Sequence, residues 1–332
     1  MARQLPLFSN EKAASDAPET VPVGPAAVGS EALELASALP TKLHLGTSSW
    51  FFPGWRGLVW DRAADETTLS RHGLAAYARH PLFSTVCVDR AFYAPLEHVQ
   101  YTAYAEQVPA AFRFVVKAPA AVTQSWLRDR DGKPQGNPTF LDASAAIAQL
   151  VTPATEGLGD KAGPLLFQFP PLGRAQMRDP ARFVDRLHAF LTALPQGPFY
   201  AVEVRDAALL TRRFFAALRE AGAHYCVAVH PRLPAVAVQA AAMAGAGPAP
   251  LVVRWNLNPR EEYEAARARY APFDRLVDPD VTTRESIARL VAAALRAGEP
   301  AYVIANNKAE GSAPLTLTRL AAAIAAALKP AA

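Results

Sequence analysis

The chain has 332 residues, of which 51% are hydrophobic, and a formal net charge of +4. That length suits one large α/β domain or two small ones with a sizeable core. No run approaches the roughly 18 consecutive apolar residues that a membrane-spanning helix requires, so we expect no membrane association. The slight positive charge fits an arginine-rich solvated surface as well as a nucleic-acid partner, so it does not distinguish between the two.

Residues 1–40 predict a flexible N-terminal tail. They mix Ala, Pro, Gly, Ser and acidic residues without a lasting period, although SEALELASAL at 30–39 favours a short helix. The start of the chain lacks a basic segment followed by an apolar core, so we expect no secretory signal.

The tail contains the peptide QLPLF at residues 4–8. It resembles the short QLxLF peptide by which bacterial DNA polymerases and repair factors dock on the replication sliding clamp. In this resemblance Gln4 is the polar anchor, while Leu5, Leu7 and Phe8 fill an apolar groove. The peptide predicts either a contact with the sliding clamp or an apolar stub that packs on the chain's own barrel.

From Lys42 onward, short β-rich runs alternate with helix-like stretches. The predicted strands cover residues 43–48, 84–89, 112–117, 164–169, 199–205, 224–230, 251–256 and 301–306. The predicted helices cover residues 69–80, 95–108, 139–151, 180–194, 208–221, 282–297 and 314–328, with a weaker candidate at 235–244. Several strands are continuous apolar runs, which is typical of a parallel sheet covered on both faces.

Eight strands that alternate with helices over residues 41–332 predict a single α/β domain with the (β/α)8 fold, the TIM barrel. A doubly wound open sheet is the alternative. No strand is followed by GxGxxG or GxxxxGK[ST], so dinucleotide and P-loop sites lose their main support. The polar insertion QSWLRDRDGKPQGNP at 124–138 is expected to form a lid or a flexible loop.

The two cysteines, Cys87 and Cys226, lie in apolar strand-like runs and are expected to be buried free thiols. This fits a reducing compartment, so we expect a cytoplasmic protein. No HxH, HExxH or CxxC spacing occurs, and we expect neither a metal nor a cofactor, although a carboxylate-bound Mg²⁺ at Asp89 and Glu203 stays open.

Active sites of such barrels lie at the carboxyl ends of the strands. Glu203 and Arg205 alternate on one predicted strand, so their side chains point to the same side. We expect Glu203 to handle protons, with Lys117 and Asp89 as further catalytic groups, and Arg205 to clamp an anion. The alternative is a structural ion pair that fills the top of the barrel.

Further residues near the strand ends are predicted to bind substrate. They are Trp50, Trp55, Tyr93, Gln168, Asp206, Arg254, Asn306, Asn307 and Lys308. The rings of the loop GTSSWFFPGWRG, residues 46–57, either line a pocket or plug the barrel end. Two carboxylates across a cleft would suit glycoside hydrolysis. However, cationic residues outnumber acidic residues at the ends of the predicted strands, which favours a phosphate- or carboxylate-bearing ligand.

Gly311 and Ser312 precede the last predicted helix. Helix N-termini after the final barrel strands frequently bind phosphate, so the two residues are predicted to contact the anion. Ordinary capping by Ser312 explains the same residues.

Several segments resemble the YecE-like family, the domain-of-unknown-function family numbered 72. They are LHLGTSSWFFPGWRG, YARHPLFSTVCVDRAFYAPL, FRFVVKAPAAVT, GPLLFQFPP, YAVEVRD and YVIANNKAEGSAP. The resemblance runs from about Leu43 to the C-terminus and implies a TIM barrel without an established activity.

Two motifs depart from the family's usual pattern. The second-strand motif usually reads like VEINSTFY; here it reads VCVDRAFY, so Cys87 stands at the usual glutamate and Asp89 at the usual asparagine. The fifth usually reads like VEFRHPSW; VEVRDAAL keeps Glu203 and Arg205 but has Asp206 in place of histidine. If the family's chemistry uses the replaced residues, this member has altered or lost it.

The sequence favours a cofactor-independent hydrolase- or lyase-like enzyme that acts on a small anionic compound. The alternative is a nucleic-acid-processing or binding factor tethered to the sliding clamp, with Trp50 and Trp55 stacking on bases. A ligand-binding barrel without catalysis is the third hypothesis.

Overall fold

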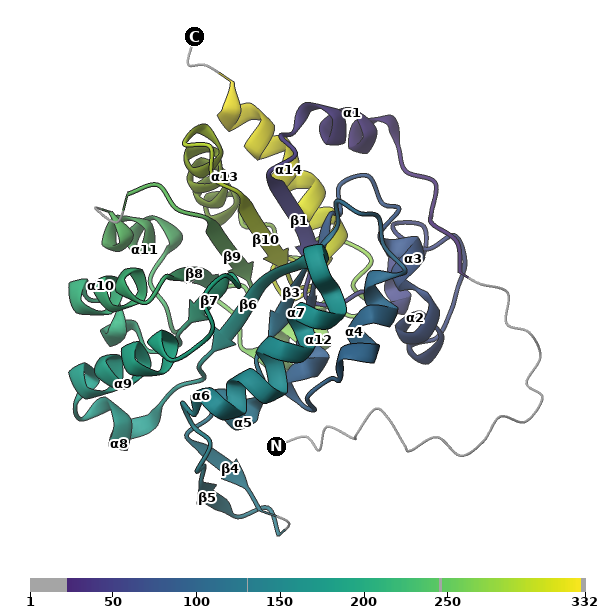
Figure 1. Cartoon of the computed structure of the whole chain (residues 1–332). Coiled ribbons are helices and arrows are strands. Elements are labelled where there is room, and N and C mark those ends of the chain that lie inside the picture. Colours follow the sequence, from purple (N-terminus) through teal and green to yellow (C-terminus); the bar gives the residue numbers. More distant parts are fainter. Residues whose placement is uncertain (1–22, 130, 245–246, 330–332) are drawn as a thin grey trace, which may run out of the picture.

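The computed structural model describes residues 23–129, 131–244 and 247–329. Its centre is a closed barrel of eight parallel strands surrounded by helices (Figure 1). In chain order the barrel strands are β1 (Leu43–Thr47), β2 (Thr85–Val88), β3 (Arg113–Lys117), β6 (Ala162–Gln168), β7 (Tyr200–Glu203), β8 (Ala223–Val229), β9 (Leu251–Trp255) and β10 (Ala301–Ala305). β1 pairs with both β2 and β10, which closes the sheet. The predicted (β/α)8 barrel is confirmed, and each barrel strand overlaps one of the predicted runs.

Helices follow the strands and cover the outside of the barrel (Figure 1). The predicted helices correspond to α2 (Glu66–His72) with α3 (Leu74–Tyr77), α4 (His98–Ala105), α6 (Ala143–Ala146) with η3 (Ile147–Val151), α9 (Pro180–Thr192), α10 (Arg212–Glu220), α11 (Val236–Met243), α13 (Val281–Arg296) and α14 (Ala313–Leu328). The sequence did not predict α5 (Ala120–Thr123), α7 (Thr152–Leu158), α8 (Gly173–Met177) or α12 (Tyr263–Tyr270). Short turns of other helix types are η1 (Pro53–Trp55), η2 (Asp89–Phe92), η3 (Ile147–Val151), η4 (Gly159–Lys161) and η5 (Ala207–Leu209). Within the described residues, no helix is both long and apolar enough to cross a membrane.

The helix α9 illustrates why these segments fold and dock as they do. The Asp179 carboxylate accepts a hydrogen bond from the backbone N–H of Arg182 at 3.0 Å, and Pro180 occupies the first turn. Both features favour a helix start at this point. The buried residues of α9 recur on one helical face and are Phe183, Val184, Leu187, Phe190 and Leu191. Burying each such side chain contributes roughly 1.5–3 kcal/mol, so this face fixes the helix on the barrel.

The insertion after β3 forms an antiparallel hairpin of β4 (Trp126–Arg128) and β5 (Pro134–Gly136). The hairpin projects away from the barrel in Figure 1. At its base, the side-chain amide of Asn137 donates hydrogen bonds to the carbonyl oxygens of Ala121 and Gln124 at 2.7 and 2.6 Å. The insertion is therefore a defined hairpin fastened at its root.

Residues 23–40 lie against the barrel, although the sequence predicted a flexible tail up to residue 40. Pro25 forms an isolated β-bridge with Trp60, and α1 (Ser30–Ala38) contacts α14. The short helix that the sequence favoured is thus present, and packing against the barrel begins well before residue 41. Residues 1–22, with the predicted partner-binding residues Gln4, Leu5, Leu7 and Phe8, lie outside the described residues.

Candidate functional site

The inside of the barrel holds a small apolar cluster, separate from the larger layer between strands and helices. Its buried members are Cys87, Val115, Leu166, Ala201, Cys226, Val252, Tyr302 and Ile304. Side chains alternate along a strand, so the next inward positions lie two residues further along. At the carboxyl ends of the strands these positions include Asp89, Lys117, Gln168, Glu203, Arg254 and Asn306. The mouth of the barrel is therefore polar and charged, directly above an apolar floor.

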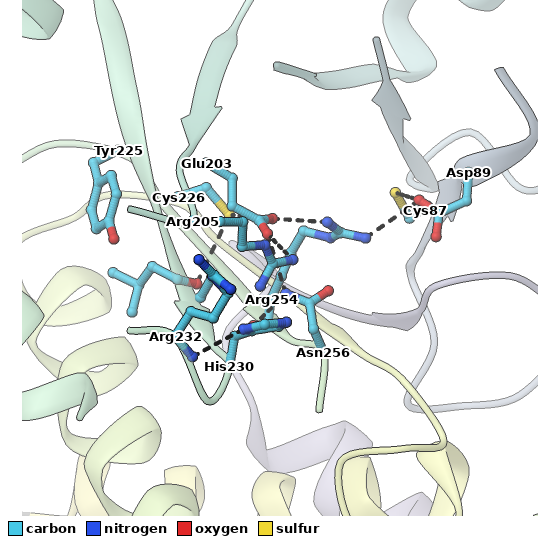
Figure 2. Close-up of polar contacts among 12 residues, drawn as sticks. Cys87, Asp89, Glu203, Arg205, Tyr225, Cys226, His230, Arg232, Arg254 and Asn256 are labelled. Atoms are coloured by element: carbon cyan, nitrogen blue, oxygen red, sulfur yellow. Dashed lines mark hydrogen bonds and ion pairs between the residues drawn. The ribbon is translucent and has the colours of Figure 1, made fainter. Parts of the chain in front are cut away.

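Glu203 lies at the centre of this layer with no exposed surface. One carboxylate oxygen pairs with Arg205, and the other accepts a hydrogen bond from Nη1 of Arg254 at 2.8 Å (Figure 2). Burial alone raises the pKa of the Glu203 carboxyl, but the two guanidinium groups outweigh burial and hold that pKa below its ordinary value. Glu203 is therefore ionised and fully engaged by protein partners.

The same network continues through Arg254 to a second carboxylate. Nη2 of Arg254 lies 3.4 Å from an oxygen of Asp89, which also accepts a hydrogen bond from the Cys87 thiol at 3.2 Å (Figure 2). The Arg254 side chain is almost completely buried, whereas 30% of the Asp89 side chain is exposed. Asp89 is thus the carboxylate of the network that faces solvent and can meet a ligand.

Lys117 ends β3 beside this network. Its Nζ lies 3.8 Å from the centre of the Phe92 ring, and the side chain is partly exposed. Within the described part of the chain, the amine forms no ion pair and no hydrogen bond with a side chain or carbonyl. Burial lowers the pKa of Lys117. The negative charge of Asp89 raises this pKa, whereas the positive charge of Arg254 lowers it further.

Lys308 follows β10 and has a similar environment. Its Nζ lies 4.4 Å from the centre of the Tyr263 ring, and 7% of the residue is exposed. Its amine likewise has no carboxylate partner among residues 23–129, 131–244 and 247–329. Burial lowers the pKa of Lys308 to about 8, while Asp89 acts in the opposite direction. The charge of Asp89 thus reaches both lysines.

The charges of this layer do not balance. Arg205, Arg254, Lys117 and Lys308 are four cationic side chains, and Glu203 and Asp89 are two carboxylates. The carboxylates are bonded to the arginines, so the uncompensated charge belongs to the lysines. Such a site attracts an anion, because buried or half-buried cations are stabilised by a counter-charge.

The aromatic loop after β1 packs into the protein. Trp50 and Trp55 are only 3% and 0% exposed, and the Trp55 ring nitrogen donates a hydrogen bond to Oδ1 of Asn307 at 3.0 Å. The two rings therefore plug this end of the molecule, which is the packing alternative that the sequence left open. Neither ring presents a free face to a ligand in this structure.

The predicted anion-binding turn before α14 is also filled by protein. Oδ1 of Asn307 accepts a second hydrogen bond from the backbone N–H of Ala313 at 2.8 Å, so Asn307 rather than Ser312 caps the helix. Gly311 and Ser312 are buried, and Gly311 has φ +120° with the backbone of Arg275 and Val277 packed against it. This turn therefore has a packing role.

The other predicted substrate-binding residues are scattered around the mouth. Tyr93 is largely exposed, and Gln168 is buried at the end of β6. The Asp206 carboxylate accepts a hydrogen bond from the backbone N–H of Leu172 at 2.9 Å, which ties two neighbouring loops together. Oδ1 of Asn306 accepts a hydrogen bond from the backbone N–H of Lys308 at 3.0 Å, and this bond positions Lys308.

Sequence reasoning missed three features of the site region. Tyr263 lies on an unpredicted helix and carries no motif, so only the fold brings it to Lys308. The buried ion pair of Glu310 and Arg284 links the loop after β10 to α13, far apart in the sequence. The Asn256 side chain lies 3.4 Å from Glu203, and its place at a strand end is the one signal that points to it.

Two surface pockets lie away from this charged layer. One of about 380 Å³ lies beside the hairpin and is lined by residues that include Trp126, Phe140 and Arg186. The other, of about 170 Å³, lies beside α1 and the start of α14. Neither pocket is lined by a predicted site residue. In the described part of the chain, no three His, Cys, Asp or Glu side chains are grouped so as to hold a metal ion.

Comparisons with known proteins give a family and related folds. The family model described as "Protein of unknown function DUF72" matches residues 44–331. A DUF72 family protein from Enterococcus faecalis V583 matches with a TM-score of 0.59 and 15% identity, over 85% of this chain and 95% of its own. A DUF72 family protein from Thermotoga maritima MSB8 matches with a TM-score of 0.51 and 18% identity, over 84% and 97%. No curated protein matches the chain.

Proposed function

The chain belongs to the DUF72 family of unknown function, and we propose that this member binds a small anionic compound at the mouth of its barrel and acts on it as a hydrolase- or lyase-like enzyme. The carboxyl ends of the strands are where barrels of this kind carry their active sites. At this end of the barrel, ion pairs join Glu203 to Arg205 and Arg254, and Arg254 to Asp89 (Figure 2).

One observation carries the proposal: two lysines with lowered pKa lie at the mouth without carboxylate partners in the described residues. A structural role for a half-buried lysine normally includes an ion pair, because an unpaired ammonium is costly to bury. Both amines rest on aromatic rings instead, which leaves their N–H groups available to phosphate or carboxylate oxygens. A ligand with such a group supplies the missing counter-charge.

The geometry supports different roles for the two carboxylates. Glu203 is fully buried and bonded to two arginines, so in this proposal it holds Arg205 and Arg254 in place. Asp89 is partly exposed and lies beside the lysines, so it is the better group to accept or return a proton. Lys308, whose pKa is about 8, can donate a proton near neutral pH.

The nucleic-acid alternative has less support than the anion-enzyme proposal. It needed Trp50 and Trp55 as stacking platforms, and both rings are buried. The predicted contact of the QLPLF peptide with the sliding clamp concerns residues outside the described part of the chain and stays a prediction.

Thermal unfolding in graded phosphate, at constant ionic strength, tests the proposal. A ligand at about 100 times its dissociation constant adds about 2.7 kcal/mol to the stability of the native state. We expect phosphate to raise the melting temperature of the wild type and of Lys133→Met, which changes an exposed lysine on the hairpin. The double variant Lys117→Met/Lys308→Met should lose most of that increase. An increase as large as that of the wild type would refute this site.

A further inference from the structure

The amine of Lys117 is placed as a nucleophile as well as an anion contact. Lys117 is the last residue of β3, so a hydrogen-bonded strand fixes its backbone at the barrel mouth. Its Nζ lies over the Phe92 ring, next to Asp89 and Arg254. We propose that Lys117 Nζ forms an imine with a small carbonyl compound that also bears a carboxylate or phosphate group. This inference rests on the proposed anion site and names the class of its ligand.

Three conditions for imine chemistry meet at this residue. A neutral amine is needed for attack, and burial next to another cation is a known way to activate a lysine. Burial and the neighbouring Arg254 both act on Lys117 in that direction. A second cation is needed to hold the anionic end of the ligand, and Lys308 has no competing carboxylate partner in the described residues.

The third condition is a proton carrier, which Asp89 supplies. The Lys117 amine attacks the carbonyl carbon, so a C–N bond forms while the carbonyl oxygen takes up a proton. The nitrogen then loses a proton, the C–O bond breaks, and the oxygen leaves with a second proton as water. The product is a protonated imine, and the step needs no oxidant or reductant. The partly exposed Asp89 carboxylate can relay these protons.

The ring of Phe92 also suits the product. A protonated imine keeps a positive charge at the position of the ammonium group, and the ring face attracts that charge. Lys308 is the less accessible nucleophile, because only 7% of the residue is exposed whereas Lys117 is partly exposed. In this arrangement Lys308 holds the anion and Lys117 reacts with the carbonyl carbon.

Reductive trapping tests the assignment on the full-length protein. The wild type is incubated with pyruvate or with glyceraldehyde 3-phosphate and borohydride, and peptide mass spectrometry locates the adducts. We expect Lys117 to be modified severalfold more than the exposed Lys133, because burial lowers the pKa of Lys117 and leaves more of its amine neutral. Inorganic phosphate should suppress the Lys117 adduct and leave Lys133 unaffected. The two probes distinguish a carboxylate ligand from a phosphate ligand.

The variants separate this inference from the proposed function. Lys117→Arg keeps the charge but cannot form an imine, so it should lose the adduct and retain the phosphate-induced rise in melting temperature. Lys117→Met should lose the adduct too, and circular dichroism checks that both variants fold. An adduct at Lys308 alone, or none above the level of Lys133, overturns the imine assignment while a phosphate response leaves the anion site standing. A wild type that neither traps a carbonyl nor responds to phosphate overturns both.

Discussion

At the scale of single residues, the ion pairs of Glu203 fix the shape of the site. A buried carboxylate costs several kcal/mol of desolvation, which its partners repay only with good geometry. Glu203 has one guanidinium on each oxygen, and Arg254 is held a second time by Asp89. Removing one member therefore leaves buried charge without a partner.

Glu203→Gln tests this interpretation. The change leaves Arg205 and Arg254 buried without their shared carboxylate, and we expect the free energy of unfolding to fall by about 3–5 kcal/mol in urea titrations. The matched control is Asp185→Asn, because Asp185 pairs with Arg213 at the surface, where both side chains are more than half exposed. That change should cost less than about 1 kcal/mol. Equal effects would contradict a special role for Glu203.

His80 gives a prediction of pH dependence. Burial lowers its pKa from 6.5 to about 4, so the native state holds the ring neutral, stacked 3.9 Å from the Phe83 ring centre. The unfolded state binds a proton at higher pH, so stability should fall as pH decreases from about 6.5 towards 4. One such group contributes up to about 3 kcal/mol over that range. In His80→Phe, the slope of the unfolding free energy against pH should become shallower, and an unchanged slope would refute this assignment.

At the scale of elements, alternation along the strands places the candidate site. The strand ends were predictable from the sequence. Their positions imply that Asp89, Lys117 and Glu203 converge at the mouth of the barrel. The roles of loop residues were not predictable in the same way. Trp55 is buried by contact with Asn307, 252 positions away in sequence, and no local pattern reports such a contact. Tyr263 reaches the site for the same reason, through the fold alone.

The hairpin of β4 and β5 is a separable element. Its strands are mostly exposed and, among the residues that the structure describes, pair only with each other, while Asn137 holds its base. Replacing residues 126–136 by a short Gly-Ser linker should shift the melting temperature by only a few degrees, because little apolar surface is lost. The phosphate response should also persist. If that response disappears in calorimetry or melting experiments, the hairpin is a lid over the mouth.

At the scale of the whole molecule, stability and chemistry are kept in separate layers. The apolar layer between strands and helices, together with the packed aromatic loop after β1, holds the barrel together. The charged layer lies above the small apolar cluster inside the barrel, at the end where the strands finish. Substitutions in the charged layer can thus change the ligand while the outer layer preserves the fold, which is how one barrel supports many activities.

A crystal structure with bound sulfate tests the central claim most directly. Sulfate carries the charge and tetrahedral oxygens of a phosphate group, and crystals grown or soaked in it would reveal the occupied positions. The anion-site proposal predicts density at the barrel mouth, with oxygens within hydrogen-bond distance of Nζ of both Lys117 and Lys308. Sulfate bound only elsewhere, such as beside Arg186 in the hairpin pocket, or a mouth closed by an ion pair of either lysine with Asp89, would contradict it.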